Sequence, residues 1–405
     1  MIVSYIKNQF NEINNDRRLQ VYGSIVSLTM VWTWMLWTEK HVGAQLANKD
    51  SILCWPFLQG CEPFLISNQT LIAIMLNSLL VLGLLSFGLF LYKRTLKIAL
   101  GVFLAVHLIK LTLFWQSYRL MGNYHFMEFL VAFSFLFIPN KIATIRVLIV
   151  GFYVSAGSIK FNTEWFSAAA MPQSWIDSGL PGMVNELGLM PISNAYAVFL
   201  EMVVSILLLS RNRYVFWFAF LQYLAFHAFS WQIVGYFYPM VMTCLIMIFP
   251  ISQHFKQHIP FRLQSRFAYA FLAIFFISQA YPKFLPGDQA ITGEGRITAL
   301  NMFDANAQCH SSLLINFKNE TIEELESRKS LRMGIRIGCE PYVYFDRAKK
   351  ICKSHQDNPS FQGVSLSLNS RQMSDQRYTQ LVNIKNICSK SISYNSFFLN
   401  DWINK

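Results

Sequence analysis

Long apolar segments recur along the first 282 residues, and they constrain the fold more than any other feature. Runs of about 17–22 mostly apolar residues recur from residue 21 to residue 281, and about 20 such residues span the hydrocarbon core of a bilayer. The chain is 54% hydrophobic and only 14% charged, whereas a soluble domain carries about 25% charged residues. The sequence therefore predicts a polytopic α-helical membrane protein.

About nine transmembrane helices fit these runs. We place them near residues 21–38, 70–92, 97–116, 124–139, 143–160, 193–210, 214–230, 234–251 and 266–282, with a tight turn at 231–233. After residue 282 the composition becomes that of an ordinary soluble domain. We therefore divide the chain into a transmembrane domain, 1–282, and a C-terminal extracytoplasmic domain, 283–405.

Basic residues gather in alternate loops, which predicts the orientation. They cluster at 17–18, 93–97, 141–146, 211–213 and 256–266, whereas the other loops carry chiefly Lys40, Lys49 and Arg119. Because basic loops stay inside, we expect a cytoplasmic N-terminus and an extracytoplasmic C-terminal domain, in a bacterial inner membrane. Basic loops of this kind also explain the formal net charge of +12, so we expect no nucleic-acid partner.

Six of the seven cysteines fall on the predicted outer side, and the seventh lies in a span. Those outside are Cys54 and Cys61 in the first outer loop and Cys309, Cys339, Cys352 and Cys388 in the C-terminal domain; Cys244 is the one in a span. An even external count predicts disulfides formed in an oxidising compartment. We expect Cys54 to pair with Cys61, while the other four allow three pairings. Their spacing is not that of a zinc site, so we expect no metal.

The C-terminal domain is predicted to be small and mainly β. Alternation in Gly363-Val-Ser-Leu-Ser-Leu indicates a half-buried strand, and the charged stretch at 320–328 indicates a helix. Before it, the outer loop at 161–194 carries Trp165 and Trp175 and two pieces, 175–180 and 182–187, that are typical of short interfacial helices. A loop of this length usually serves a site.

Titratable side chains inside predicted spans are functional candidates, because a charge at a helix centre costs about 2.5–3.5 kcal/mol on insertion scales. Those in this chain are His107, Lys110, His125, Glu128, Lys160, Glu201 and His227. Lys110, Glu128 and Glu201 either neutralise one another between helices or serve a site. His107, near mid-span, is more typical of a hydrogen-bonded packing residue than of a catalyst.

Lys160, His125 and His227 are predicted at the outer ends of their spans. Lys160 is either an interface lysine whose ammonium reaches water or a partly desolvated lysine that acts as a base. A lysine and two histidines converging below an aromatic loop would form an acid–base pocket.

Two segments resemble the vitamin K-dependent γ-carboxylases and their bacterial HTTM-domain relatives. Tyr153-Val-Ser-Ala-Gly-Ser-Ile-Lys160-Phe, followed by Trp165, is similar to the family's Tyr-Phe-x-Ala-Gly-x-x-Lys-Leu…Trp motif. Phe-His227-Ala-Phe-Ser-Trp-Gln-Ile-Val-Gly is similar to its Phe-His-x-x-Asn-Ser-Gln-x-Phe-x-Ile-Gly segment. Asn123-Tyr-His125 resembles its Asn-His-Ser-Tyr segment with the histidine offset by one residue, and the segments at 293–302 and 367–377 are similar more weakly. The resemblance covers most of residues 100–300.

The resemblance implies an activity, its substrates and its site. In that family the matching lysine deprotonates a hydroquinone, O2 converts the quinol to an epoxide, and a strong base formed on the way removes a proton from glutamate, which CO2 then carboxylates. Carried over, Lys160 is the base, and His125 and His227 hydrogen-bond the quinol or shuttle its protons. The residues implied to bind the quinol are Asn123, Tyr153, Trp165, Trp231 and Gln232. The quinol is vitamin K hydroquinone or is menaquinol-like, and the partners are the lipid bilayer and an extracytoplasmic protein substrate.

A second class of function stays open, namely a non-catalytic membrane scaffold or assembly protein that keeps the fold and binds a partner through its C-terminal domain. The combination of Lys160, His227 and Asn123 favours the enzyme. A scaffold has no need of a lysine at that depth.

Cysteine labelling tests the orientation. After reduction, a membrane-impermeant maleimide should label Cys309 or Cys388 in intact cells, because both lie in the domain predicted to be outside. Labelling that requires lysis would contradict this orientation.

Overall fold

The computed structural model describes residues 2–49, 52–171, 173, 176–177, 179–254, 265–299, 307–324, 337–389 and 391–405. Helices coincide with all nine apolar runs. They are α2 (Arg17–Glu39), α4 (Gln69–Phe90), α5 (Leu96–Trp115), α6 (Asn123–Phe137), α7 (Lys141–Ile159), α10 (Met190–Phe199) with η6 (Leu200–Val204) and α11 (Ser205–Leu207), α12 (Arg213–Val234), α13 (Phe237–Ile246) with α14 (Ile248–His254), and α15 (Arg266–Ala280).

Six of the helical segments in the described ranges are long and apolar enough to cross a membrane. They are α2, α4, α5 extended by η3 (Lys93–Thr95), α7, the segment from α10 to α11, and α15 extended by η7 (Tyr281–Phe284). The chain is therefore an α-helical membrane protein, and nine crossings remain a prediction.

Short helices complete the part of the chain before the sheet. They are α1 (Ile2–Asn15), α3 (Val42–Ala47), η2 (Glu62–Phe64), η4 (Tyr118–Leu120), α8 (Thr163–Phe166), α9 (Gly179–Glu186), α16 (Gln289–Thr292) and η8 (Arg296–Thr298). α9 covers most of the interfacial helix predicted at 182–187. The other one, at 175–180, includes Trp175 and residue 178, which lie outside the described residues.

The tight turn predicted at 231–233 is wrong. α12 continues to Val234, so Trp231 and Gln232 lie in its last helical turn. The chain reverses at Gly235, whose φ of 80° lies in the left-handed region that glycine adopts without a steric penalty.

Close helix packing relies on small residues in this bundle. Gly83 of α4 faces α2, and a Cβ added there would lie 2.9 Å from the Met30 Cβ. Beside this contact the hydroxyls of Ser27 and Ser86 are 2.8 Å apart. Small residues let neighbouring helices approach closely where lipid tails provide no hydrophobic drive for association.

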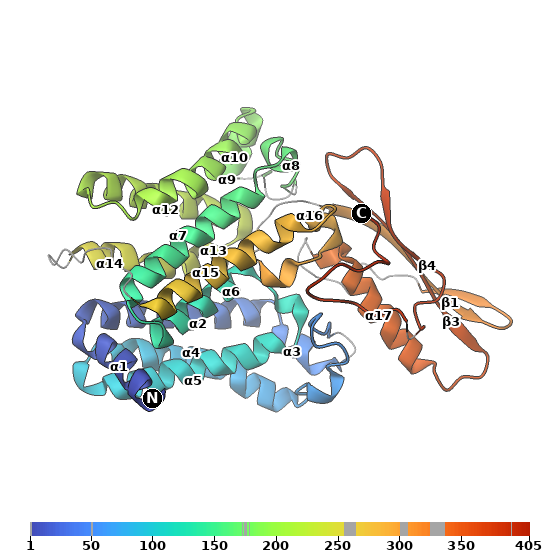
Figure 1. The fold of residues 1–405 in the computed structure, drawn as a ribbon, viewed down its shortest axis with the longest axis horizontal. Coiled ribbons are helices and arrows are strands. Elements are labelled where there is room, and N and C mark those ends of the chain that lie inside the picture. Colours follow the sequence, from blue (N-terminus) through green and yellow to red (C-terminus); the bar gives the residue numbers. More distant parts are fainter. Residues whose placement is uncertain are drawn as a thin grey trace.

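The predicted inner loops gather at one end of the helical bundle. Arg17 donates to the carbonyl of Leu91 at 2.9 Å, and Arg146 donates to the carbonyl of Leu208 at 3.2 Å. The sheet and the C-terminus lie at the opposite end (Figure 1). The basic residues in the described loops therefore share an end, as their alternation predicts.

The C-terminal domain contains an antiparallel sheet and a helix. Its strands are β1 (Ala307–Phe317), β2 (Thr321–Glu324), β3 (Phe361–Gln372) and β4 (Thr379–Ile384), in the order β2-β1-β3-β4, and η9 (Ile337–Cys339) precedes α17 (Pro341–Ser354), which packs on β3. Val364, Leu366 and Leu368 are buried at alternate positions of β3, which confirms the predicted strand.

The helix predicted at 320–328 is wrong where the structure describes it. Thr321–Glu324 form β2, in which Ile322 pairs with Ile315 of β1, and residues 325–328 lie outside the described ranges. Pairing with a long neighbouring strand overrides the helix propensity of the glutamates. α17, in contrast, was not predicted from the sequence.

Three disulfides link the six cysteines that are predicted to be external. Cys54 pairs with Cys61 as predicted, and the open pairings resolve into Cys309–Cys339 and Cys352–Cys388. The two C-terminal disulfides fasten η9 to β1 and α17 to the segment after β4. Cys244 is free and buried in α13.

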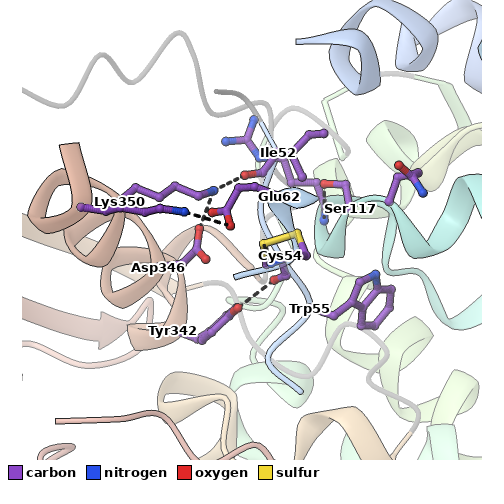
Figure 2. The surroundings of a disulfide bond; sticks show 12 residues. Ile52, Cys54, Trp55, Glu62, Ser117, Tyr342, Asp346 and Lys350 are labelled. Atoms are coloured by element: carbon purple, nitrogen blue, oxygen red, sulfur yellow. Dashed lines mark hydrogen bonds and ion pairs between the residues drawn. A yellow bond between two sulfur atoms is a disulfide. The ribbon is translucent and has the colours of Figure 1, made fainter. Parts of the chain in front are cut away.

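The C-terminal domain docks through α17 on the loop between α3 and α4. Figure 2 shows Tyr342 donating to the carbonyl of Cys54, at 2.8 Å, and Lys350 donating to the carbonyl of Ile52. Lys350 also pairs with Asp346 at 2.8 Å. Burial raises the pKa of the Asp346 carboxyl, and Lys350 opposes that shift. The Cys54–Cys61 loop is thus part of a contact between the domains.

A buried ion pair near this contact should be needed for stable docking. Glu340 pairs with Arg296 and accepts a hydrogen bond from Tyr118 at 3.0 Å, and all three side chains are buried. Glu340→Ala leaves the guanidinium without its carboxylate, so we expect a loss of about 3–5 kcal/mol. Protease protection of the C-terminal domain measures it.

Lys353→Ala is the matched control, because Lys353 is exposed and lies 3.9 Å from Glu62. It should change stability by less than about 0.5 kcal/mol. Equal protease sensitivity of the two variants would contradict this account of docking.

Candidate functional site

Lys160 lies inside the protein, at the end of α7. The residue is 2% exposed, and its Nζ lies 2.5 and 2.6 Å from the two carboxylate oxygens of Glu201, which is fully buried. Two charges at this depth persist only as a hydrogen-bonded pair. The ammonium is therefore held by Glu201 and does not reach the water interface.

Two local features bring α7 and η6 close enough for this pair. A Cβ added at Gly157, one turn before Lys160, would lie 3.0 Å from the Glu201 Cβ and 2.6 Å from Met202. Glu201 itself lies in η6, a π-helical turn, whose Leu200 carbonyl accepts a hydrogen bond from Tyr223 at 3.0 Å. Single π-helical turns inside α-helices frequently occur at functional sites.

The ring of Trp165 covers the ammonium of Lys160. The Lys160 Nζ is 5.1 Å from the ring centroid, within the range of a cation–π contact. Trp165 Nε1 donates to the carbonyl of Asn194 at 2.9 Å, and Asn194 Nδ2 donates to the carbonyl of Trp165 at 2.8 Å. These reciprocal bonds fix the loop over Lys160.

A pocket of about 400 Å³ lies beside Lys160, and we call it the Lys160 pocket. It is formed by residues of α10, α12 and α13, most of them apolar. Besides Lys160 and Trp165, the lining includes Met171, Leu180, Ser193, Asn194, Tyr196, Ala197, Gln222, Ala225, Phe226, Phe229, Ser230, Ile233, Val234 and Tyr238. Leu180 and Tyr196 are exposed, so the pocket opens on the lateral surface of the bundle.

Tyr238 brings an unpaired hydroxyl to this pocket. The residue is buried, and its hydroxyl has no hydrogen-bond partner among the described residues. Buried polar groups are normally satisfied, so this hydroxyl marks a place where a ligand atom fits. Sequence reasoning missed Tyr238, although it lies in the segment Gly235-Tyr-Phe-Tyr238, directly after the helix that carries His227.

His227 and Tyr153 lie next to the Lys160 pocket. His227 Nε2 is 2.9 Å from the Tyr153 hydroxyl, and the His227 ring is 5.7 Å from the ring of Tyr238. Lys160 is close enough to His227 to interact electrostatically. The structure thus brings Lys160, Trp165, His227 and Tyr153 together as the sequence predicts.

Asn123, Trp231 and Gln232 do not join this group, and neither does His125. The His125 ring lies among Trp37, Phe114 and Phe237, and no contact between described residues joins it to Lys160. Asn123 lines a different pocket. Trp231 is 47% exposed, and Gln232 accepts a hydrogen bond from the backbone of Leu180 at 2.9 Å, which holds α9.

A second buried ion pair lies elsewhere in the bundle. Lys110 pairs with Glu128 and donates to Thr33 at 2.9 Å, while Thr29 donates to Glu128 at 2.8 Å. Lys110 and Glu128 therefore balance each other, and Glu201 belongs to Lys160. Sequence reasoning named these carboxylates but left their partners open.

Glu164, which sequence analysis did not single out, joins the site to the C-terminal domain. It neighbours Trp165 in α8, is 1% exposed, and accepts a hydrogen bond at 2.6 Å from the backbone of Ser374, after β3. The loop that covers Lys160 therefore contacts the turn between β3 and β4.

No protein-family model, curated protein or solved structure matches this chain. The functional argument consequently rests on the sequence motifs and on the geometry of the site.

Separating Lys160 from Glu201 should be costly, whereas replacing both should not. Lys160→Met leaves a buried carboxylate without its cation, so we expect about 3–5 kcal/mol of destabilisation. The double variant Lys160→Met, Glu201→Leu removes both charges and should regain most of that stability. Thermal unfolding in detergent micelles compares them, and a double variant as unstable as the single one would contradict the pairing.

Proposed function

We propose that this protein is a quinol-dependent membrane enzyme, similar in chemistry to the vitamin K-dependent γ-carboxylases, that couples oxygenation of a lipophilic hydroquinone to modification of an extracytoplasmic substrate. The observation that carries the proposal is the buried Lys160–Glu201 pair at the edge of an apolar pocket. A membrane scaffold, the alternative, needs no buried cation beside a pocket.

The Lys160 pocket suits a hydroquinone in size and lining. Its volume of about 400 Å³ lies within the range of about 300–1,000 Å³ that is usual for ligand sites. Phe226, Phe229 and Trp165 offer aromatic surface to a flat ring. Because the pocket opens on the lateral surface of the bundle, a lipophilic substrate can enter directly from the bilayer.

Lys160 can accept a proton only as a neutral amine, and Glu201 supplies a way to reach that form. Both carboxylate oxygens lie within hydrogen-bond distance of the Lys160 Nζ, so one proton can move from the ammonium to the carboxylate. The pair then consists of an amine beside a carboxylic acid, with no separated charge.

The amine then takes the proton of the quinol hydroxyl, which leaves a quinolate oxygen next to the new ammonium of Lys160. Ammonium and quinolate stabilise each other in a site that excludes water. In this proposal the unpaired hydroxyl of Tyr238, which lines the pocket, donates to the second quinol oxygen. O2 supplies the oxygenation, and CO2 supplies the carboxyl group if the acceptor is a glutamate.

The contact between α8 and the C-terminal domain supports a role for that domain in meeting the acceptor. α8 carries Trp165, which covers Lys160, and Glu164, which accepts a hydrogen bond from Ser374 of the C-terminal domain. In the orientation that the basic loops predict, the C-terminal domain is extracytoplasmic. We therefore propose an extracytoplasmic protein substrate that approaches between the C-terminal domain and the loop carrying Trp165.

Conservative substitutions at the pair test the proposal. Lys160→Arg keeps the positive charge but cannot provide a neutral amine, and Glu201→Gln cannot take the proton from Lys160. We expect each to lower quinol oxidation by about 100-fold or more, the usual contribution of a general base, in a reconstituted assay with menaquinol.

Lys283→Arg is the matched control, since Lys283 is an exposed lysine at the same end of the bundle and donates to Ser158 at 2.7 Å. It should oxidise menaquinol at the rate of the unmodified protein. Near-normal oxidation by Lys160→Arg would show that Lys160 is not the base.

A further inference from the structure

A second pocket, which we call the α5–α6 pocket, lies between helices α5 and α6. Its volume is about 380 Å³, and its lining is almost entirely aliphatic and aromatic. Leu108, Leu111 and Phe133 line it and are exposed on the outer surface of their helices. Since α5 belongs to a membrane-crossing segment, the pocket opens towards lipid. No lining residue is shared with the Lys160 pocket.

His107 is a polar residue in the lining of this pocket, and one of its ring nitrogens is unpaired. The residue is 6% exposed. Its Nδ1 lies 2.7 Å from the carbonyl oxygen of Phe103, and because a carbonyl only accepts, Nδ1 carries the hydrogen. Nε2 has no hydrogen-bond partner among the described residues, and the nearest carboxylate oxygen, of Glu128, is 3.9 Å away.

Burial favours the neutral form of His107. Glu128 is already balanced by Lys110, so a proton on His107 would add an unbalanced charge inside a membrane segment. In the neutral ring with a hydrogen on Nδ1, Nε2 is an acceptor. A buried acceptor without a partner is unfavourable, and a ligand that donates a hydrogen bond would satisfy it.

The same charges restrict what that ligand is. An acidic head group, such as a fatty-acid carboxylate or a phosphate, would place a negative charge close to Glu128, and Arg296, which also lines the pocket, is already paired with Glu340. An amine would add a cation close to Lys110. An uncharged hydroxyl meets neither repulsion and supplies the missing donor.

We propose that the α5–α6 pocket binds a membrane-resident lipid alcohol, whose hydroxyl donates to His107 Nε2 and whose hydrocarbon chain lies along Leu108, Leu111 and Phe133. The site is separate from the proposed quinol site, and it gives this chain a second, non-covalent lipid ligand.

Photolabelling of the full chain in lipid nanodiscs tests the proposal. The probe is geranylgeraniol bearing a diazirine, and its methyl ether is the matched probe without a donor. The alcohol should label peptides of α5 and α6. Because one hydrogen bond distinguishes the probes, competition should require about tenfold more unlabelled ether than unlabelled geranylgeraniol. Equal competition by both compounds would overturn the proposal.

Three variants locate the interaction. His107→Phe keeps an aromatic ring but removes the acceptor, so the preference for the alcohol should disappear; a preference that persists would refute the role of Nε2. Leu111→Trp fills the pocket and should abolish labelling, whereas Leu84→Trp, at an exposed position of α4, should leave it unchanged. If His107→Phe does not fold, the Leu111→Trp result decides the location, and unchanged labelling of that variant would place the probe elsewhere.

Discussion

The buried pair of Lys160 and Glu201 is the interaction on which the site depends. Each charge is tolerable at this depth only because the other is present, and their contact fixes α7 against the π-helical turn η6. A second buried cation of the bundle, Lys110, is held in the same way by Glu128. In such a pair each charge is balanced by its neighbour, so both side chains stay buried and do not contact lipid. In the mechanism that we propose, Lys160 becomes a base when one proton moves within the pair.

Helix positions followed from hydropathy and length, because a membrane segment must be long and apolar whatever its neighbours are. Strand β3 was predictable from its alternating pattern, since Val364, Leu366 and Leu368 alternate with serines. Contacts between residues that are distant in sequence could not be predicted in this way. Glu201 is 41 residues from Lys160, and the link between Cys309 and Cys339 depends on where η9 lies against β1. Strand β2 was missed because its neighbour β1, not its own glutamates, determines its conformation.

The candidate site was predicted in part. Lys160, Trp165 and His227 meet because α7, α8 and α12 do, whereas Asn123 lies in the α5–α6 pocket and His125 in an aromatic cluster. A motif on one helix shows which of its residues share a face, but not which helix lies opposite. Tyr238 follows this logic too: its unpaired hydroxyl became recognisable only when the surrounding side chains were placed.

The contacts of the C-terminal domain have a consequence for the order of assembly. This domain is synthesised after the helices, yet it supplies the Ser374 backbone donor to Glu164 and the Glu340 carboxylate to Tyr118. Until it has emerged and folded, Glu164 and Tyr118 lack these partners. The segment that carries Glu164 and Trp165 therefore gains its contact with the C-terminal domain only after the helices have been made.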